Sequence, residues 1–416
     1  MSTTPRTASA DSRRRLGRAA VLTPVERWLI RRLLAAKRCP PIRVVAWTGQ
    51  EFGASRAEAV ATLVIRDRRS LWSMALRPEL GFGEAYSRGS VEVEGSLVDL
   101  LEAVYRAVGP HRSVEHRFSG LRSRLRHGNS LTGSKANIHH HYDLGNEFYS
   151  WWLDERMLYT CAYFPTREAD LEAAQVAKMD LVARKLRLQP GETVVEAGCG
   201  WGALAMHFAE HYGVRVKAFN ISTEQIRWAR ESARRRGLEG RVEFIEDDYR
   251  NVSGRFDVFV SVGMLEHVGR DHYPDLGGVV DRVLSPQGRG LVHTIGRVHP
   301  RPLNPWIEKH IFPGAYPPTL KEMMDLFEPF DLPVLDVENL RAHYALTLEH
   351  WLQRYERSID KVRRRYDENF ARTWRLYLSG SIASFRSGHL QLFQVLFGRH
   401  AYQEAWTREE LYRNPA

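Results

Sequence analysis

Residues 193–202 read Thr-Val-Val-Glu-Ala-Gly-Cys-Gly-Trp-Gly, and this stretch decides the fold. Its first half is apolar apart from one acid, which is typical of a buried strand, and the apolar residues after Gly202 predict a helix. Between them Gly198, Gly200 and Gly202 alternate, so the backbone can turn tightly and leave room for a ligand at the helix N-terminus. The strand–loop–helix setting favours a ligand site over a merely structural turn.

Strand-like and helix-like segments alternate on both sides of this loop. Alternation of this kind predicts an α/β fold with a doubly wound parallel sheet. The predicted strands are 193–197, 214–219, 242–246, 256–262 and 290–295, with a late strand at 390–397, and the predicted helices are 168–188, 203–212 and 222–236.

The region before residue 128 has a different pattern, which predicts a smaller α+β domain. Its predicted strands are 44–47, 59–65 and 71–76, its turns lie at residues 81–83 and Gly89, and a helix covers 98–108. The expected organisation is a disordered tail at 1–22, an N-terminal domain at 23–127, a linker at 128–137 and a larger domain at 138–416.

The chain of 416 residues carries a net charge of +10, which favours a nucleic acid or an anionic membrane as partner. The charge is local: residues 1–40 hold ten basic and two acidic residues, and 111–135 hold six and one, so 10 − 8 − 5 leaves −3 elsewhere. Three widely spaced cysteines fit a reducing cytosol better than a disulfide framework or a zinc site. The tract His139–His141 has no partner ligands at metal spacing, and no metal is predicted.

Thr23, Pro24 and Glu26 predict a capped helix start, and apolar residues then recur at helical spacing beside Arg27, Arg31 and Arg32. Such a basic amphipathic helix can lie on anionic lipid. An ordinary surface helix that packs Trp28 and Leu29 on its own domain remains equally open.

The glycine spacing differs from the G-x-G-x-x-G of dinucleotide sites, which also need an acid about 20 residues further on. No acid stands there, because the second strand ends in Phe-Asn-Ile-Ser at 219–222. The loop, with Glu196 two residues before it, instead resembles motif I of class I S-adenosylmethionine (SAM) methyltransferases. The resemblance implies that Glu196 acts on the amino group of SAM, and it leaves the ribose to Asn220 and Gln225.

Six ordered segments between residues 138 and 398 resemble one family, the cyclopropane fatty acid and mycolic acid cyclopropane synthases. They are His141–Asn146, Tyr159–Phe164, Glu196–Gly202, Ser261–Gly269, Leu291–Ile295 and Tyr344–Leu348. The resemblance implies methylene transfer to a cis double bond, in which the olefin attacks the sulfonium methyl of SAM. A bound bicarbonate would then remove a proton from the new methyl as the ring closes.

The resemblance also implies the residues of the site. The bicarbonate cradle would be Cys161, Glu266, His293, Ile295 and Tyr344, with Cys161 and Ile295 acting through their backbone N–H groups and Glu266 holding a shared proton. The SAM site would comprise Tyr159, Thr160, Glu196, Gly198, Gly200, Gly202, Asn220, Gln225, Asp248 and Tyr249. Taken singly, Cys161 and His293 could be core residues, and Asp248 and Tyr249 a solvated turn.

The expected enzyme is a cytoplasmic protein, peripheral at the inner membrane surface and homodimeric, which acts on unsaturated phospholipid acyl chains through a lipid-interacting N-terminal domain. One alternative is a related activity that leaves a 10-methylene or 10-methyl branch. An RNA or DNA methyltransferase would need a proline-cysteine or Asn-Pro-Pro-Tyr motif after the fourth strand, where this chain has Met264–His267. A non-catalytic lipid-binding protein is the third. The sequence leaves chain length, double-bond position and head group open.

Overall fold

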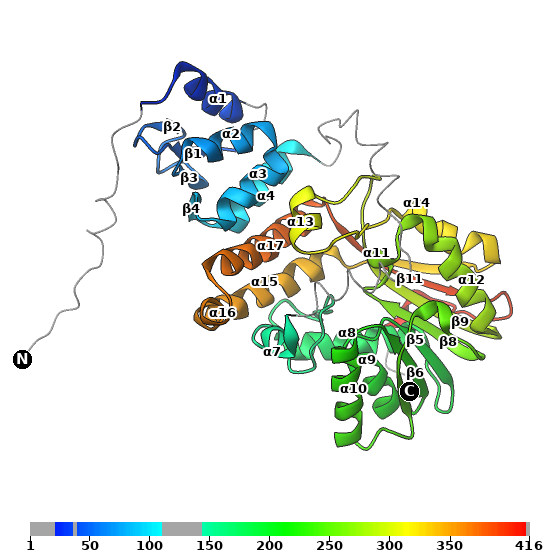
Figure 1. Ribbon diagram of the computed structural model, residues 1–416. Coiled ribbons are helices and arrows are strands. Elements are labelled where there is room, and N and C mark those ends of the chain that lie inside the picture. The colour runs from blue at the N-terminus through cyan, green and yellow to red at the C-terminus, as the bar shows by residue number, and fades with distance from the viewer. Residues whose placement is uncertain (1–20, 36–39, 110–143, 413–416) are drawn as a thin grey trace, which may run out of the picture.

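The computed structural model describes residues 21–35, 40–109 and 144–412 (Figure 1). Within these ranges an N-terminal unit built on a small sheet packs against a larger unit built on a long one. Four sequence predictions lie outside the described residues: most of the tail at 1–22, the basic segment at 111–135, the linker at 128–137 and the histidine tract at 139–141.

The larger sheet has seven strands in the order β10-β11-β9-β8-β5-β6-β7. Five of them, from β9 to β7 in that order, run parallel, while β11 runs antiparallel to both β9 and β10. The doubly wound prediction is therefore confirmed, with an antiparallel pair at one edge. The bounds are β5 Thr193–Ala197, β6 Arg215–Asn220, β7 Val242–Glu246, β8 Phe256–Val262, β9 Leu284–Gly296, β10 Val334–Asn339 and β11 Gln391–Gly398.

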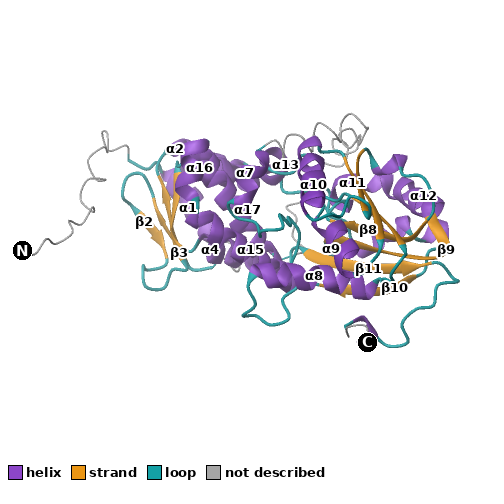
Figure 2. Ribbon diagram, turned by 90° about the horizontal axis from the view of Figure 1, so that it is seen from below, coloured by secondary structure: helices purple, strands orange, loops and turns teal. Residues whose placement is uncertain are grey.

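Helices cover both faces of this sheet (Figure 2). Alternate strand residues face opposite sides: Val194 packs with α8, α9 and α10, whereas its neighbour Val195 packs with α12. Because both faces are buried, the parallel strands are almost continuously apolar. The bounds are α7 Gly145–Ser150, α8 Leu171–Lys185, α9 Ala203–His211, α10 Thr223–Arg235, α11 Leu265–Val268 and α12 Tyr273–Val283.

The N-terminal unit holds a four-stranded sheet in the order β2-β1-β3-β4. Its strands are β1 Ile42–Val45, β2 Glu51–Gly53, β3 Ala61–Ile65 and β4 Val91–Gly95, and its helices are α1 Pro24–Leu34, α2 Arg68–Leu76, α3 Pro78–Ser87 and α4 Leu97–Val108. The strand predicted at 71–76 is wrong, because this segment is α2, whose start Asp67 caps by accepting from the Ser70 N–H at 2.8 Å.

The turn predicted at residues 81–83 is also wrong, since both glycines lie inside α3. Close packing explains them. A Cβ on Gly81 would come within 2.3 Å of the Ser73 carbonyl oxygen, and one on Gly83 would meet the Trp306 ring at 2.3 Å. Glycine at these positions therefore allows α3 to approach α2 and α13 (Pro305–His310), rather than breaking the chain.

Helix α1 begins with the predicted capping box between Thr23 and Glu26. Ile30 and Glu26 face inward, and Glu26 pairs with Arg68. Trp28 faces outward, with 52% of its surface exposed and the Arg32 guanidinium over its ring. The apolar residues of α1 thus divide between the domain core and the surface.

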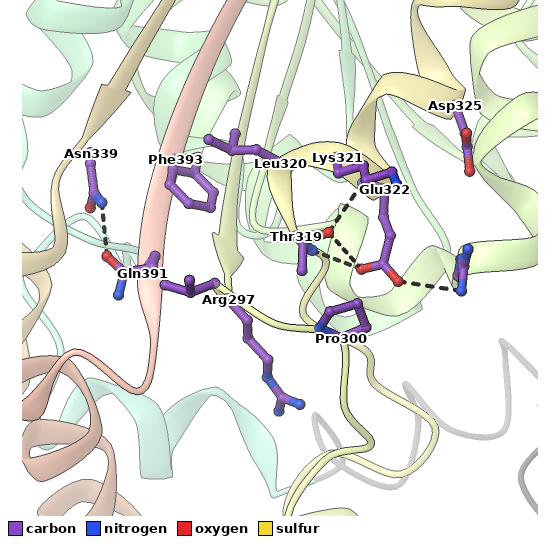
Figure 3. A pocket seen from close by; sticks show the side chains of 12 residues that line it. Arg297, Pro300, Thr319, Leu320, Lys321, Glu322, Asp325, Asn339, Gln391 and Phe393 are labelled. Carbon is purple, nitrogen blue, oxygen red and sulfur yellow. Dashed lines mark hydrogen bonds and ion pairs between the residues drawn. The ribbon is translucent and has the colours of Figure 1, made fainter. Parts of the chain in front are cut away.

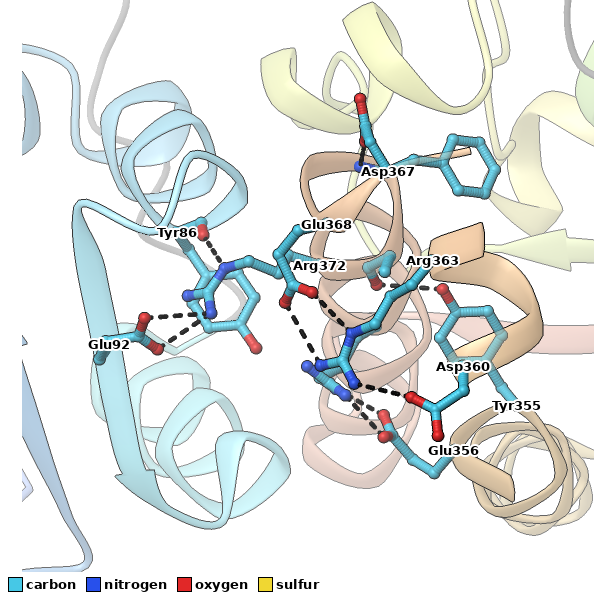
Figure 4. A network of polar contacts seen from close by, with 12 residues as sticks. Tyr86, Glu92, Tyr355, Glu356, Asp360, Arg363, Asp367, Glu368 and Arg372 are labelled. Atoms are coloured by element: carbon cyan, nitrogen blue, oxygen red, sulfur yellow. Dashed lines mark hydrogen bonds and ion pairs between the residues drawn. The ribbon is translucent and has the colours of Figure 1, made fainter. Parts of the chain in front are cut away.

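The two units meet along α17 (Glu368–Ser387), which contacts both α3 and α4. Buried Arg372 donates to the carbonyl oxygens of Tyr86 and Val91 at 2.6 and 2.9 Å, pairs with Glu92 at 3.0 Å, and lies over the Tyr86 ring (Figure 4). The neighbouring helices are α13 Pro305–His310, α14 Leu320–Met323, α15 Arg341–Arg357 and α16 Ile359–Arg365.

We expect Arg372→Met to lower the free energy of unfolding of the N-terminal unit by roughly 2–3 kcal/mol, because it removes charge-assisted hydrogen bonds from buried carbonyls. Urea denaturation followed by tryptophan fluorescence measures the change. Arg363→Met is the matched control, since Arg363 is more exposed and pairs with Glu368 and Asp360 inside the larger unit (Figure 4). It should cost under about 1 kcal/mol. Equal losses in both variants would contradict the assignment.

Candidate active site

The glycine loop after β5 has three left-handed residues, with φ of +82° at Gly198, +53° at Gly200 and +81° at Gly202. A Cβ on Gly198 would press on Met264 and one on Gly202 on Phe244, at 2.9 and 2.4 Å. At Gly200 a Cβ would meet nothing within 4 Å. The outer glycines are thus needed for packing, whereas Gly200 borders open space that a ligand can enter.

Glu196 closes β5 just before this loop and is buried. Its Oε2 atom finds no hydrogen-bond partner among the described residues. Burial raises the pKa of Glu196 to about 7, against the opposing effects of Lys178 and the Ala205 N–H. Near neutral pH the carboxyl is therefore poised between its two forms and can accept from an ammonium or hydroxyl group of a ligand.

Asn220, the last residue of β6, binds the glycine loop. The Asn220 amide donates to the Gly200 carbonyl oxygen at 3.2 Å and to Gln225 Oε1 at 2.8 Å. The structure thus brings Asn220 and Gln225 together beside the glycine loop, although their amides already bind each other.

The third strand leads into Asp248 and Tyr249. The Asp248 carboxylate accepts from the backbone N–H of Arg250 and pairs with its guanidinium at 2.8 Å, so it is already neutralised. The Tyr249 ring packs with Phe219 and Leu265, and its hydroxyl is buried with no partner in the described part of the chain. Neither residue belongs to a solvated turn.

Tyr159 and Thr160 lie on a loop between α7 and α8. Tyr159 shares a hydrogen bond of 2.7 Å with Tyr377 of α17 and contacts the rings of Tyr149, Trp152 and Trp351. Thr160 Oγ1 accepts from the Lys178 ammonium at 2.9 Å. The rings of Tyr149, Trp152, Tyr159 and Trp351 thus form an aromatic wall, which contacts the glycine loop through Trp201. The Lys178 ammonium is buried beside Thr160.

Glu266 is the second residue of α11, the short helix after β8, and is buried. Its Oε1 accepts from the Ile295 N–H at 2.5 Å, while its Oε2 has no partner within the described ranges. Burial outweighs the Ile295 contact and raises the Glu266 pKa to about 7. The carboxyl can therefore hold or share a proton at neutral pH.

His293 lies in β9, two residues before Ile295 and on the same face of the strand. Its Nδ1 lies 3.0 Å from the side-chain nitrogen of Gln394, and its Nε2 is buried without a partner among described residues. Burial and the charges of Lys178 and Lys185 hold the His293 pKa well below its usual value. The ring is therefore neutral at physiological pH.

Cys161 and Tyr344 both contact the carbonyl oxygen of Leu340. This oxygen accepts from the Tyr344 N–H at 3.1 Å and lies 4.0 Å from Cys161 Sγ. The Cys161 thiol is fully buried, and burial raises its pKa far above the usual range. It is thus a neutral thiol and not a nucleophile.

Lysine 178 on α8 connects the two groups of predicted residues, because its charge affects the pKa of Glu196, Cys161 and His293 alike. Burial lowers its own pKa to about 8. Sequence reasoning missed this residue, and also Lys185, Gln394 and Tyr377. The available signal was that Lys178 and Lys185 stand seven residues apart, on one face of a helix whose other buried side chains are apolar except for Gln175.

A pocket of about 530 Å³ opens beside the end of β9 (Figure 3). Arg297, Glu322 and Gln391 line it, and none of the predicted site residues does. It is linked to Glu266 through Tyr316, whose N–H donates to the Glu266 carbonyl oxygen at 2.7 Å and whose hydroxyl donates to Glu322 at 2.8 Å. The described residues contain neither a cluster of three metal-ligating side chains nor a helix able to cross a membrane.

Comparisons with known proteins identify the family of the chain. The model of the family described as mycolic acid cyclopropane synthetase matches residues 129–395, and a domain of unknown function matches 29–113. The chain is 38% identical over 326 residues to the cyclopropane-fatty-acyl-phospholipid synthase of Escherichia coli (strain K12), covering 77% of this chain and 83% of that protein. It is 34% identical over 374 residues to a tuberculostearic acid methyltransferase of Mycobacterium tuberculosis, covering 85% and 87%.

Solved structures show the same relationship. A mycolic acid cyclopropane synthase complexed with SAH and CTAB superposes with a TM-score of 0.61 at 29% identity. The match covers 64% of this chain and 98% of that chain.

Proposed function

This chain belongs to the mycolic acid cyclopropane synthetase family of SAM-dependent methyltransferases, and on that premise we propose that it converts cis double bonds of unsaturated phospholipid acyl chains into cyclopropane rings. The observation that carries the proposal is a pair of buried polar atoms, Glu266 Oε2 and His293 Nε2, that have no partner among the described residues. They lie where β8 and β9 end, beside a glycine loop that contacts Met264. Strand ends of this kind face the ligand crevice of an open sheet.

The residues present fit SAM, which when bound supplies an electrophilic methyl group on a sulfonium. The open face at Gly200 admits the ligand, and the free oxygen of Glu196 accepts its ammonium group. Tyr249 offers an apolar ring surface and a hydroxyl that has no partner among the described residues. Asp248 can bind SAM only through the lone pairs of its carboxylate that Arg250 does not occupy. The aromatic ring of Tyr159 attracts a sulfonium cation.

The residues also fit a bicarbonate ion, which when bound supplies a base for the proton of the transferred methyl group. The His293 Nε2 atom, which has no partner among the described residues, is available to the ion, and Glu266 can share a proton with it. The Ile295 N–H is engaged by Glu266, so Ile295 holds this carboxyl in place, and its direct contact with an ion stays a prediction. The surrounding rings of Tyr159, Trp152 and Trp351 exclude the water that would quench a carbocation.

Product analysis tests the proposal. Purified protein is incubated with SAM and vesicles of a cis-monounsaturated phospholipid, and the released fatty acids are separated by gas chromatography–mass spectrometry. A ring product supports the proposal. An unmodified acyl chain, together with methylated RNA in a parallel incubation of the protein with SAM and RNA, would overturn it.

A second outcome is a 10-methylene chain, which a separate reductase would have to saturate to give a 10-methyl chain. The 34% identity to a tuberculostearic acid methyltransferase favours this alternative, which uses the same acceptor and loses a different proton. The same chromatogram separates the two products by retention time and fragmentation.

We also propose that α1 docks the enzyme on an anionic bilayer, where it would act as a peripheral cytoplasmic enzyme. Trp28 and Val25 are about half exposed, and Arg31 and Arg32 face solvent beside them. This arrangement suits the interface of an anionic membrane. The predicted homodimer remains a prediction.

The joint substitution of Arg27, Arg31 and Arg32 by glutamine should weaken binding to anionic vesicles at least about tenfold, since each basic residue contributes about 1 kcal/mol. Co-sedimentation at low salt measures the binding. The matched control replaces Arg227, Arg234 and Arg235 of α10 by glutamine, so that the same amount of charge is removed from the larger unit. If both triple variants bind equally, α1 is not the docking element.

A further inference from the structure

Four buried or half-buried polar residues from four different elements form a chain that ends at His293. The Lys185 ammonium of α8 pairs with Glu338 of β10 at 2.5 Å and donates to Gln394 Oε1 of β11 at 2.7 Å. The Gln394 amide nitrogen then lies 3.0 Å from His293 Nδ1. Lys185, Gln394 and His293 are each at most 2% exposed, so water does not compete for these contacts.

The chemistry of these groups gives the chain one direction. An ammonium group only donates, so the Gln394 side chain must turn its oxygen toward Lys185. Its NH₂ group therefore points at His293, where Nδ1 can only accept. A neutral imidazole that accepts at Nδ1 carries its proton at Nε2. The lysine thus decides which nitrogen of a histidine two contacts away is protonated.

We propose that Lys185 and Gln394 are positioning residues that fix His293 as the Nε2–H tautomer, so that it presents a hydrogen-bond donor, and never a lone pair, to an anion in the site. Only the role of this donor in binding an anion rests on the proposed function. The opposite tautomer would aim a lone pair at a negatively charged ligand. An imidazolium would place an N–H of Nδ1 against the Gln394 NH₂ group.

The charged groups around the ring favour the same state. Lys178 and Lys185 of α8 both disfavour a positive charge on His293, and Glu338 is separated from the ring by Lys185 and Gln394. Burial and these two lysines therefore keep the His293 ring neutral.

The test uses protein labelled with ¹⁵N in its histidines and needs neither SAM nor lipid. Long-range ¹H–¹⁵N correlation separates a protonated ring nitrogen from an unprotonated one, and His293→Gln identifies the signal by its loss. At about pH 7 we expect Nδ1 of His293 to be unprotonated and Nε2 to be protonated. A protonated Nδ1 in the unmodified chain overturns the proposal, independently of whether the enzyme makes rings.

The variant Gln394→Glu inverts the chain, because a carboxylate beside Nδ1 accepts and so requires a proton there. We expect the Nδ1 signal to move to the protonated position and methyl transfer to fall at least about tenfold, with SAM affinity unchanged. Gln391→Glu, on the same strand, is the control for a new carboxyl group and should leave the His293 signals in place. Gln394→Glu with an unprotonated Nδ1 would refute the relay.

The variant Lys185→Met keeps the side-chain length and removes the donor that orients Gln394. The amide can then turn either way, so we expect a mixture of the two His293 tautomers and an intermediate rate. A single Nε2–H tautomer in folded Lys185→Met would show that the lysine does not set the direction. This second variant keeps the relay testable if Gln394→Glu does not fold.

Discussion

Replacing Glu266 by glutamine is expected to reduce methyl transfer at least about 100-fold, within the range for loss of a positioned proton-sharing group. The amide has the same shape and can still accept from the Ile295 N–H, so the local structure should survive. It cannot share or exchange the proton that a carboxyl with a pKa of about 7 holds near neutral pH. Initial rates with labelled SAM, and SAM affinity by calorimetry, separate a chemical effect from a binding effect.

The matched control is Glu322→Gln, because Glu322 is equally buried and lies close by, but outside the predicted site. We expect its rate to stay within about threefold of the unmodified enzyme, because Glu322 caps α14 and binds Tyr316 and Arg270, none of which is a predicted site residue. Near-full activity in Glu266→Gln would show that the carboxyl is not needed, and the proposed role of this residue would fall.

Gly200→Ala is expected to lower SAM affinity at least about tenfold while the protein stays folded. The new methyl group would meet no protein atom within 4 Å, but it would stand on the open face of the loop where a ligand approaches. The left-handed backbone adds a cost of about 1–2 kcal/mol, which amounts to a few degrees in Tm. Calorimetry gives the affinity, and thermal unfolding gives the stability.

Gly202→Ala is the comparison that makes this prediction specific. Its Cβ would lie 2.4 Å from the Phe244 ring and 2.9 Å from Ala229, both buried. Overpacking of this kind costs about 1–3 kcal/mol beyond the backbone strain. The larger loss of Tm should therefore belong to Gly202→Ala and the more selective loss of SAM affinity to Gly200→Ala. Unchanged SAM binding in Gly200→Ala would place the ligand elsewhere.

Much of the larger unit could be predicted from sequence, because its strands are apolar runs of ordinary length bounded by turns and helices. The errors fell in the N-terminal unit. Residues 71–76 are too short and apolar for periodicity to separate a strand from a helix. Gly81 and Gly83 indicated a turn, yet they are glycines because other helices approach their backbone closely, and sequence alone cannot reveal that contact.

The same reason explains what was missed in the site. The predicted residues lie in motifs, and three of them, Glu196, Glu266 and His293, lie near the ends of β5, β8 and β9. Lys185 and Gln394 are 209 positions apart, and Tyr159 and Tyr377 are 218 apart. Neither pair belongs to a local pattern, so only the packing of α8, β11 and α17 brings them together. Polar groups that orient other polar groups leave little trace in a single sequence.

Helix α17 holds the N-terminal unit through Arg372 and reaches the Tyr159 hydroxyl through Tyr377, five residues or about 7.5 Å further along. A shortened enzyme that begins near residue 144 would lack the N-terminal unit against which Arg372 is buried. The Arg372 guanidinium would then have lost its counterion, one and a half helical turns from the aromatic wall. In such a fragment the newly exposed face of α17 would have to be redesigned, beginning with an apolar or small polar residue at position 372. Only then could its activity be compared with that of the whole protein. Miniaturising this enzyme is thus a problem of redesigning one helix face, and not only of choosing where to cut.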